Sequence, residues 1–159
     1  MLLERARRVV KGELAEGHRY VWWGKVRSAN RLQGQSHTDD ILAIGRALVA
    51  DEDHASEVQL YLTDYRSLYV ADVSHVAEAL GETERKAAPS YYFNTKLDCD
   101  FWFLLGDIRL LVADDLLGVI AELRKLCNVH YHDKPVSLYG GMVDLPLVVT
   151  RPDGQRFFD

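Results

Sequence analysis

Potential metal ligands lie close together in the segment NVHYHDK. It carries His130 and His132 two positions apart, followed by Asp133. Alternate residues of a strand share a face, so both imidazoles would point the same way and can serve a metal. Three ligands without a distant partner make a weak site. Surface histidines are therefore the favoured interpretation, and we assign no metal-binding residue.

The acidic stretch DCD offers a second possible chemistry. Asp98 and Asp100, with Glu57 or Asp64, would supply the oxygen ligands of a magnesium-dependent nuclease. Such nucleases usually carry a carboxylate followed closely by Glu-x-Lys on an adjacent strand, and none of the predicted strands carries that pattern. Charged side chains at a strand end are the better interpretation. The glycines of YGGM lack the strand-then-helix context of a phosphate loop, and no nucleophile elbow occurs. We expect neither an enzyme nor a cofactor.

The most aromatic stretch is YVWWGKVRSANR, residues 20–31. Trp22 and Trp23 are adjacent in a run with the composition of a strand, so their side chains should point to opposite faces. One indole would face the core, and the other would either cover a helix or line a ligand site. The stretch also holds a local group of basic residues, Lys25, Arg27 and Arg31.

The composition predicts a single globular domain over residues 1–159. Hydrophobic residues make up 48% and charged residues 27%, and no apolar run is long enough to span a bilayer. The N-terminal segment lacks the features of a secretory signal, and two cysteines give no disulfide framework. We therefore expect a cytoplasmic protein with no membrane partner. The net charge of -5 argues against nucleic-acid binding through bulk electrostatic attraction.

Helical periodicity and strand alternation predict the elements of the first half. Apolar residues at helical spacing indicate an amphipathic helix over residues 2–16, ended by Gly17. A strand follows over Tyr20–Val26, and then a helix in SHTDDILAIGRALVAD that Ser36 or Thr38 can cap. Two further strands, over 58–62 and 68–73, are joined by the hairpin turn TDYRS.

The second half continues with short helical and strand segments. AEALGETERKAAPS predicts a helical turn and a loop, and DFWFLLGDIRLLV predicts one long or bent strand with a bulge or a kink at Gly106. Asp114 and Asp115 should start the helix DDLLGVIAELRKL. Two short strand pieces should flank Gly140 and Gly141.

This order of elements predicts an α+β domain. Consecutive strands pair by a hairpin and the helices follow no repeating βαβ pattern, so a curled, mostly antiparallel sheet is favoured. We expect a small β-barrel flanked by helices. Its N-terminal helix would cover residues 1–17, its barrel core 18–150, and a tail or linker 151–159.

The order of parts resembles the PUA-like superfamily and, within it, the EVE and YTH branch of modified-base readers. Its opening strand is similar to YVWWGKVRSAN, its central hairpin to VQLYLTDYRSLYVADV, its later strand and helix to FWFLLGDIRLLVADDLLGVIAELRKL, and its closing Pro-Val-Ser segment to HDKPVSLYGG. The resemblance covers most of residues 20–149. The Ser-Glu-Pro triplet usual in EVE domains is replaced here by Arg27-Ser28-Ala29, and the N-terminal helix lies outside the pattern.

The resemblance implies binding without catalysis. In the family, a flipped or single-stranded base is held in a pocket of aromatic and polar groups. Motif position carries over Lys25, Ser28 and Asn30 at the end of the first strand and Tyr65 in the hairpin turn. Residue type adds neighbouring basic side chains and possible cage walls, namely Arg31, Arg66, Trp23, Tyr92 and Trp102.

The leading hypothesis is therefore a nucleic-acid binding module for DNA or RNA that recognises a base, including a modified one. Such modules usually serve as specificity domains of prokaryotic restriction or defence systems, which implies an effector nuclease or ATPase partner. The alternative is a protein interaction domain that docks a partner through Tyr91, Tyr92 and the first helix. A metal-dependent hydrolase is the third hypothesis, with the side chains Asp98, Asp100, His130 and His132.

Overall fold

The computed structural model of the chain describes residues 20–26, 37–51, 57–89, 91–94, 98–130, 132–137 and 148–158. The helix expected over residues 2–16 lies outside the described residues. So do the glycines Gly140 and Gly141 and the capping candidate Ser36.

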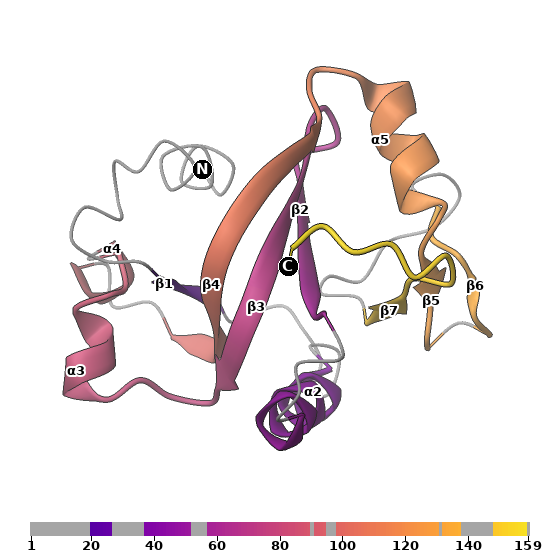
Figure 1. Cartoon of the computed structure of the whole chain (residues 1–159). Helices are drawn as coiled ribbons and strands as arrows, with labels where there is room; N and C mark the ends of the chain where they lie inside the picture. Colours follow the sequence, from indigo (N-terminus) through magenta and orange to yellow (C-terminus); the bar gives the residue numbers. More distant parts are fainter. Residues whose placement is uncertain are drawn as a thin grey trace.

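The main sheet has four antiparallel strands in the order β1-β4-β3-β2 (Figure 1). They are β1 (Val21–Val26), β2 (Gln59–Thr63), β3 (Leu68–Ala77) and β4 (Cys99–Val112). All four were predicted from the sequence, although β3 continues four residues beyond the expected end at Val73. β4 lies between β1 and β3, so both of its edges are hydrogen-bonded to other strands.

The turn between β2 and β3 is fixed by its own polar side chains. The Asp64 carboxylate accepts hydrogen bonds from the backbone N–H groups of Arg66, at 2.9 Å, and Ser67, at 2.8 Å. Thr63 Oγ1 donates to the Ser67 carbonyl at 2.7 Å. These short-range bonds are typical of an Asx turn, and they hold Tyr65 at a φ of 73°. The predicted hairpin is confirmed.

β4 shifts its register near the predicted bulge. Ala71 and Val73 of β3 pair with Ile108 and Leu105, so β4 carries one extra residue between these pairs, at Gly106 and Asp107. An extra residue bends a strand and increases its twist. The same strand can therefore pair with β1 at its start and with the β2–β3 hairpin at its end.

The two faces of the sheet carry different layers. Trp23, Phe103 and Val73 lie on the face covered by α2 (Thr38–Ala50). Trp22 and Trp102 lie on the other face, next to the short helices α3 (Glu82–Arg85) and α4 (Tyr91–Asn94). The expectation that Trp22 and Trp23 point to opposite faces is confirmed, and both faces are packed.

The free edge of β1 is covered by the segment that contains α3 and α4. Trp22 N–H donates to the Ala87 carbonyl at 2.9 Å, and Gly24 N–H donates to the Tyr92 hydroxyl at 3.2 Å. These two alternate N–H groups point away from β4. Their partners therefore satisfy donors that would otherwise be an open strand edge.

α2 begins without the side-chain cap that the sequence suggested. His37 occupies the N-cap position in the left-handed region, with a φ of 53°, and makes no side-chain capping bond. Thr38 is the first helical residue rather than the cap. The helix approaches β3 closely at Gly45, where an added Cβ would lie 2.8 Å from Val76 Cβ.

α5 and a second sheet complete the described structure. α5 (Leu116–Leu123) follows Asp115 and packs with Leu68, Leu126 and Val136 in a second apolar cluster. The second sheet has three short antiparallel strands in the order β6-β5-β7, with β5 (Cys127–Asn128), β6 (Lys134–Pro135) and β7 (Val149–Thr150). In Figure 1 these elements lie on the far side of β2 from β1.

The described residues form an α+β structure with two antiparallel sheets, as the element order predicts. A closed barrel is not found in this part of the chain. Residues 151–158, interpreted from the sequence as a tail or linker, pack against β2, and Phe158 is buried. None of the described helices has both the length and the apolarity that a membrane crossing requires.

Replacing Gly24 by alanine should destabilise the protein. An added Cβ would lie 2.7 Å from Cys99 Sγ and 2.7 Å from the Trp102 ring, in a buried region. We expect Gly24→Ala to lower the free energy of unfolding by about 1–3 kcal/mol in urea denaturation. Val49→Ala, at an exposed position of α2, is the control and should change it by less than about 0.5 kcal/mol. Equal stability of the two variants would contradict this packing.

Candidate functional site

Two of the expected cage residues are core residues. Tyr92 and Trp102 have exposed fractions of 2% and 6%, and their rings meet edge to face at a centroid distance of 4.9 Å. With Trp22 they form an apolar cluster that holds α4 against β1 and β4. Neither ring is open to a ligand. The buried position of Tyr92 also removes it from a protein-docking surface, and the side chain of Tyr91 lies outside the described residues.

Tyr65 and Arg66 lie at the opposite end of the sheet from the other candidates. Leu68, just after their turn, pairs with Val112 at the end of β4, whereas Lys25 pairs with Phe101 near its start. About 35 Å of strand separates these positions at the usual rise per residue. Both side chains are exposed, but the structure does not bring them together with Lys25 or Trp23.

Trp23 is the predicted site residue with an unexplained polar group. Its ring stacks on Phe103 at a centroid distance of 6.1 Å and packs beside the main core cluster. The indole N–H is buried and has no hydrogen-bond partner among the described residues. Burying such a donor unpaired costs about 1–3 kcal/mol. Ser28, Asn30 and Arg31, which follow on the same stretch, lie outside the described residues.

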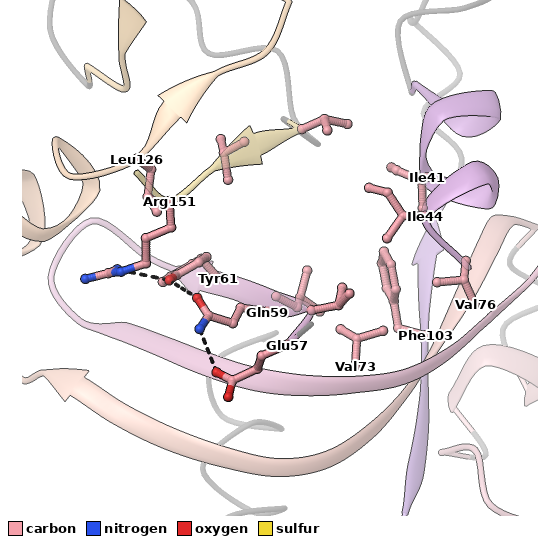
Figure 2. A pocket seen from close by; sticks show the side chains of 14 residues that line it. Ile41, Ile44, Glu57, Gln59, Tyr61, Val73, Val76, Phe103, Leu126 and Arg151 are labelled. Carbon is pink, nitrogen blue, oxygen red and sulfur yellow. Dashed lines mark hydrogen bonds between the residues drawn. The ribbon is translucent and has the colours of Figure 1, made fainter. Parts of the chain in front are cut away.

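A cavity of about 240 Å³ opens on the same face of the main sheet as Trp23 (Figure 2). Ile41 and Ile44 of α2 line one side, Phe103 and Val73 form part of the sheet wall, and residues of the second sheet such as Val149 line the other side. The walls are mainly apolar. Pockets for drug-sized ligands have about 300–1,000 Å³, so this cavity suits a smaller molecule such as a single ring system.

Polar side chains gather at one end of the cavity. Arg151 Nη1 donates to the Tyr61 hydroxyl at 3.0 Å, and that hydroxyl donates to Gln59 Oε1. Gln59 Nε2 in turn donates to Glu57 Oε1 at 2.6 Å (Figure 2). Tyr61 and Gln59 belong to β2, Glu57 lies just before it, and Arg151 directly follows β7. The chain of hydrogen bonds therefore connects the main sheet with the second sheet.

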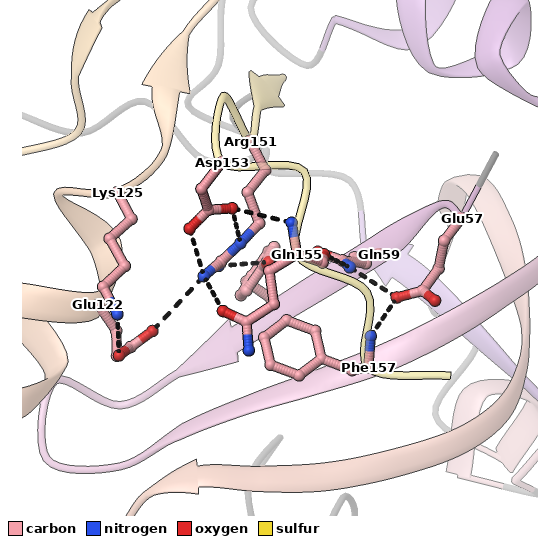
Figure 3. A network of polar contacts seen from close by, with 9 residues as sticks. Glu57, Gln59, Glu122, Lys125, Arg151, Asp153, Gln155 and Phe157 are labelled. Carbon is pink, nitrogen blue, oxygen red and sulfur yellow. Dashed lines mark hydrogen bonds and ion pairs between the residues drawn. The ribbon is translucent and has the colours of Figure 1, made fainter. Parts of the chain in front are cut away.

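Arg151 is held in place on its other side by acidic and amide groups (Figure 3). Its Nε lies 2.8 Å from Asp153 Oδ1 and its Nη2 lies 3.2 Å from Asp153 Oδ2, which is a two-point contact. Nη2 also donates to Gln155 Oε1 at 2.8 Å, and Glu122 Oε2 lies 3.9 Å away. The charge of Arg151 is thus largely neutralised within the domain.

Glu57 anchors the C-terminal residues at the same end of the cavity. One carboxylate oxygen accepts the backbone N–H of Phe157 at 2.8 Å (Figure 3). The other accepts the backbone N–H of Phe158 at 3.0 Å. The Arg156 guanidinium lies 3.6 Å away. Glu57 has a side-chain exposure of 5%, so this carboxylate is a buried anion that backbone donors stabilise.

Burial and hydrogen bonds shift the pKa values of the acidic groups at and near this end of the cavity. Burial alone would raise the pKa of Glu57, but hydrogen bonds from Phe157, Gln59 and Phe158 outweigh it and the net pKa is lowered. Burial raises the pKa of Tyr61, and its hydrogen bond from Arg151 offsets this only in part. Burial also raises the pKa of Asp72, with a further contribution from the charge of Glu57.

The described side chains give little support to nucleophilic catalysis. Burial, with the charge of Asp100, raises the pKa of the Cys99 thiol to about 11. The thiol is therefore protonated at neutral pH and is a poor nucleophile. His130 lies close to His37 and Asp40, and this group of potential ligands does not include His132, Asp98 or Asp100. The residues of the hydrolase hypothesis are not assembled into one site.

Sequence reasoning did not identify the cavity or its polar end. Glu57 was weighed only as a magnesium ligand, and Tyr61, Gln59 and Arg151 carry no motif. Their partners lie about 90 to 100 positions away along the chain. One signal was present, because Tyr61 and Gln59 alternate along a strand and should share a face.

Comparisons of this chain with protein-family models, curated proteins and solved structures gave no match.

Replacing Glu57 by glutamine should reduce stability in a pH-dependent way. A carboxylate with a lowered folded-state pKa stabilises the protein fully above its ordinary pKa of 4.5, and this stabilisation is lost as the pH falls through the folded-state value. We expect Glu57→Gln to cost about 1–3 kcal/mol of unfolding free energy at pH 7, since charged hydrogen bonds are lost. The difference from wild type should shrink below pH 4.5.

Urea denaturation at pH 7 and at steps between pH 5 and pH 3 measures this difference. Glu78→Gln, at an exposed position of the same chain, is the matched control and should change stability by less than about 0.5 kcal/mol at every pH. A cost for Glu57→Gln that stays constant down to pH 3 would show that the folded-state pKa of Glu57 is not lowered.

Proposed function

We propose that this domain is a binding module for a single nucleobase, presented on a flipped nucleotide or a single strand. The observation that carries the proposal is the mainly apolar cavity with aromatic residues in its lining, which include Phe103. The Trp23 ring stacks on Phe103 from outside the lining, and its buried indole N–H has no partner among the described residues. A base supplies ring nitrogens and carbonyl oxygens as acceptors for such a donor. A base seated against Phe103 would accept this hydrogen bond if Phe103 and Trp23 shift enough to bring the N–H to the cavity.

The dimensions and lining of the cavity support a base rather than a longer ligand. Its volume of about 240 Å³ suits one heteroaromatic ring system, and Phe103 and Tyr61 offer aromatic surface. Stacking on an aromatic side chain is worth about 1–3 kcal/mol per base. The apolar residues of α2 provide a wall against which a methyl group on a modified base gains contact.

The charge distribution favours recognition of the base over the phosphate backbone. The net charge of the chain is -5, and Arg151 at the cavity is already paired with Asp153. Phosphate contacts make affinity fall steeply with salt concentration. Binding through the base should therefore depend only weakly on salt, and an effector nuclease or ATPase partner domain would supply further contacts to the strand.

The same proposal includes the finer fold assignment. It takes the antiparallel sheet with a bent β4, the β2–β3 hairpin and the flanking helices as the counterparts of the parts of a PUA-like domain. We propose that the complete chain forms a curled, EVE-like barrel around this sheet.

Binding should be measured by fluorescence polarisation with short DNA and RNA oligonucleotides. The panel contains duplexes and single strands, each with and without methylated or hydroxymethylated bases, at two salt concentrations. We expect one base to bind and to quench tryptophan emission, with a weak dependence on salt. Absence of binding across the whole panel would contradict the proposal.

Four variants test the position of the site. Trp23→Phe removes the indole N–H and keeps an aromatic ring, so affinity should fall about 2- to 10-fold while stability stays equal or rises. Ile44→Phe fills the cavity from α2 and should weaken binding, whereas Val49→Phe on the exposed side of the same helix should not. Tyr65→Ala should also leave binding unchanged; if it abolishes binding, the ligand lies at the hairpin turn instead.

A protein interaction domain is the second candidate. Leu116 and Leu117 at the start of α5 are 47% and 73% exposed, and Tyr65 in the neighbouring hairpin turn is 50% exposed. The two segments are joined by a hydrogen bond from Asp115 N–H to the Arg66 carbonyl at 2.8 Å. Exposed apolar side chains gathered in this way are typical of contact surfaces. A partner whose binding is lost in Leu117→Lys and unaffected by the oligonucleotides would favour this candidate.

A further inference from the structure

Three potential metal ligands from distant parts of the chain meet at the start of α2. His37 occupies the N-cap position and Asp40 lies in the first turn of the helix. His130 belongs to the turn that follows β5, where its backbone N–H donates to Asn128 Oδ1 at 3.0 Å. A hydrogen bond from Val129 N–H to the Val148 carbonyl, at 3.1 Å, ties the same turn to the segment before β7. The fold therefore supplies the distant partners that His130 lacks in the sequence.

The spacing of the ligand atoms suits one small ion. His130 Nε2 lies 3.1 Å from Asp40 Oδ2, and His37 Nδ1 lies 4.0 Å from the same oxygen. One ligand atom from each residue lies within 4.8 Å of the others. Ligands about 2.0–2.1 Å from a tetrahedral ion are about 3.3 Å from each other, which falls between the two observed distances. The two imidazole rings are stacked in parallel, with centroids 4.2 Å apart. Because a metal lies in the plane of each imidazole that binds it, at least one of the two rings must rotate about its side-chain bonds for both nitrogens to bind one ion.

The donor set selects a class of metal. Two imidazole nitrogens and one carboxylate oxygen suit zinc and its neighbours in the first transition row, whereas magnesium and calcium prefer oxygen ligands alone. Three protein ligands leave a fourth tetrahedral position for water. The side chains are 21%, 53% and 37% exposed for His37, Asp40 and His130, so solvent can reach that position.

We propose that His37, Asp40 and His130 bind a divalent transition-metal ion of the zinc class. This inference goes beyond the proposed base binding and does not depend on it. The ion joins α2 to the turn between β5 and β6. Since residues of α2 and of the second sheet line opposite sides of the cavity, the bound ion fixes the distance between these two walls.

The test uses the untagged full chain, stripped with a chelator and dialysed. Titration with Zn²⁺ by calorimetry should show one equivalent bound, and Zn²⁺ should raise the melting temperature because it binds the folded state. Titration with Co²⁺ should give the visible absorption of a tetrahedral site. His130→Gln and Asp40→Asn should each weaken Zn²⁺ binding by at least about tenfold, since even changes in the second shell of a metal site cost 10- to 100-fold.

His75→Gln removes an exposed imidazole that lies outside this group, and it should leave Zn²⁺ affinity unchanged. A folded wild-type protein that takes up neither ion overturns the proposal. It is also wrong if His132→Gln weakens binding while Asp40→Asn does not, because the ion would then lie within the turn after β5. Base binding by the chelator-treated protein separates this result from the proposed function, since that measurement needs no metal.

Discussion

The described structure depends on β4, the strand whose two edges and two faces are all in contact with other elements. It pairs with β1 and β3, its odd-numbered aromatic residues Phe101 and Phe103 face α2, and Trp102 faces α3 and α4. Such a strand tolerates no slip, because a shift of one residue would exchange its two faces. The bulge at Gly106 and Asp107 is one of three places at which the register between β4 and β3 shifts. The register of β4 therefore determines the positions of α2, the β2–β3 hairpin and Trp23.

The cavity lies where two packed parts of the domain, the main sheet with α2 and the second sheet with α5, meet without filling the space between them. α2 and the main sheet share one apolar cluster, while α5 and the second sheet share another. Arg151 and Glu57 join the second sheet and the C-terminal residues to β2 at one end. The charge of Arg151 is compensated by Asp153, and the charge of Glu57 by backbone N–H donors. These two side chains therefore fix the polar end of the cavity in place, and they create little electrostatic field that would attract a polyanion.

The sequence predicted the elements whose signals are local. Strand alternation gave β1, β2 and β4, turn chemistry gave the hairpin at Asp64, and Gly106 indicated the bulge. The sequence did not show that Tyr92 and Trp102, expected as walls of an aromatic cage, are core residues. Tyrosine and tryptophan occur both in ligand cages and in cores, and only tertiary packing distinguishes the two. The resemblance placed Tyr65 and Lys25 in one binding site, but they lie at opposite ends of the sheet, about the length of β4 apart. The pairing of Glu57 with Phe157 depends on tertiary structure that no local pattern encodes.

The two proposed sites meet in α2. His37 and Asp40 lie at its first turn, and Ile41 and Ile44 on the following turn line the cavity. An ion bound to His37, Asp40 and His130 would restrict the movement of α2 relative to the second sheet. The protein would then lose less conformational entropy when it binds a ligand that contacts both walls of the cavity. Coupling of this kind is reciprocal: a base in the cavity would raise metal affinity by the same factor. A rigid cavity would show no such coupling, even if both sites bind.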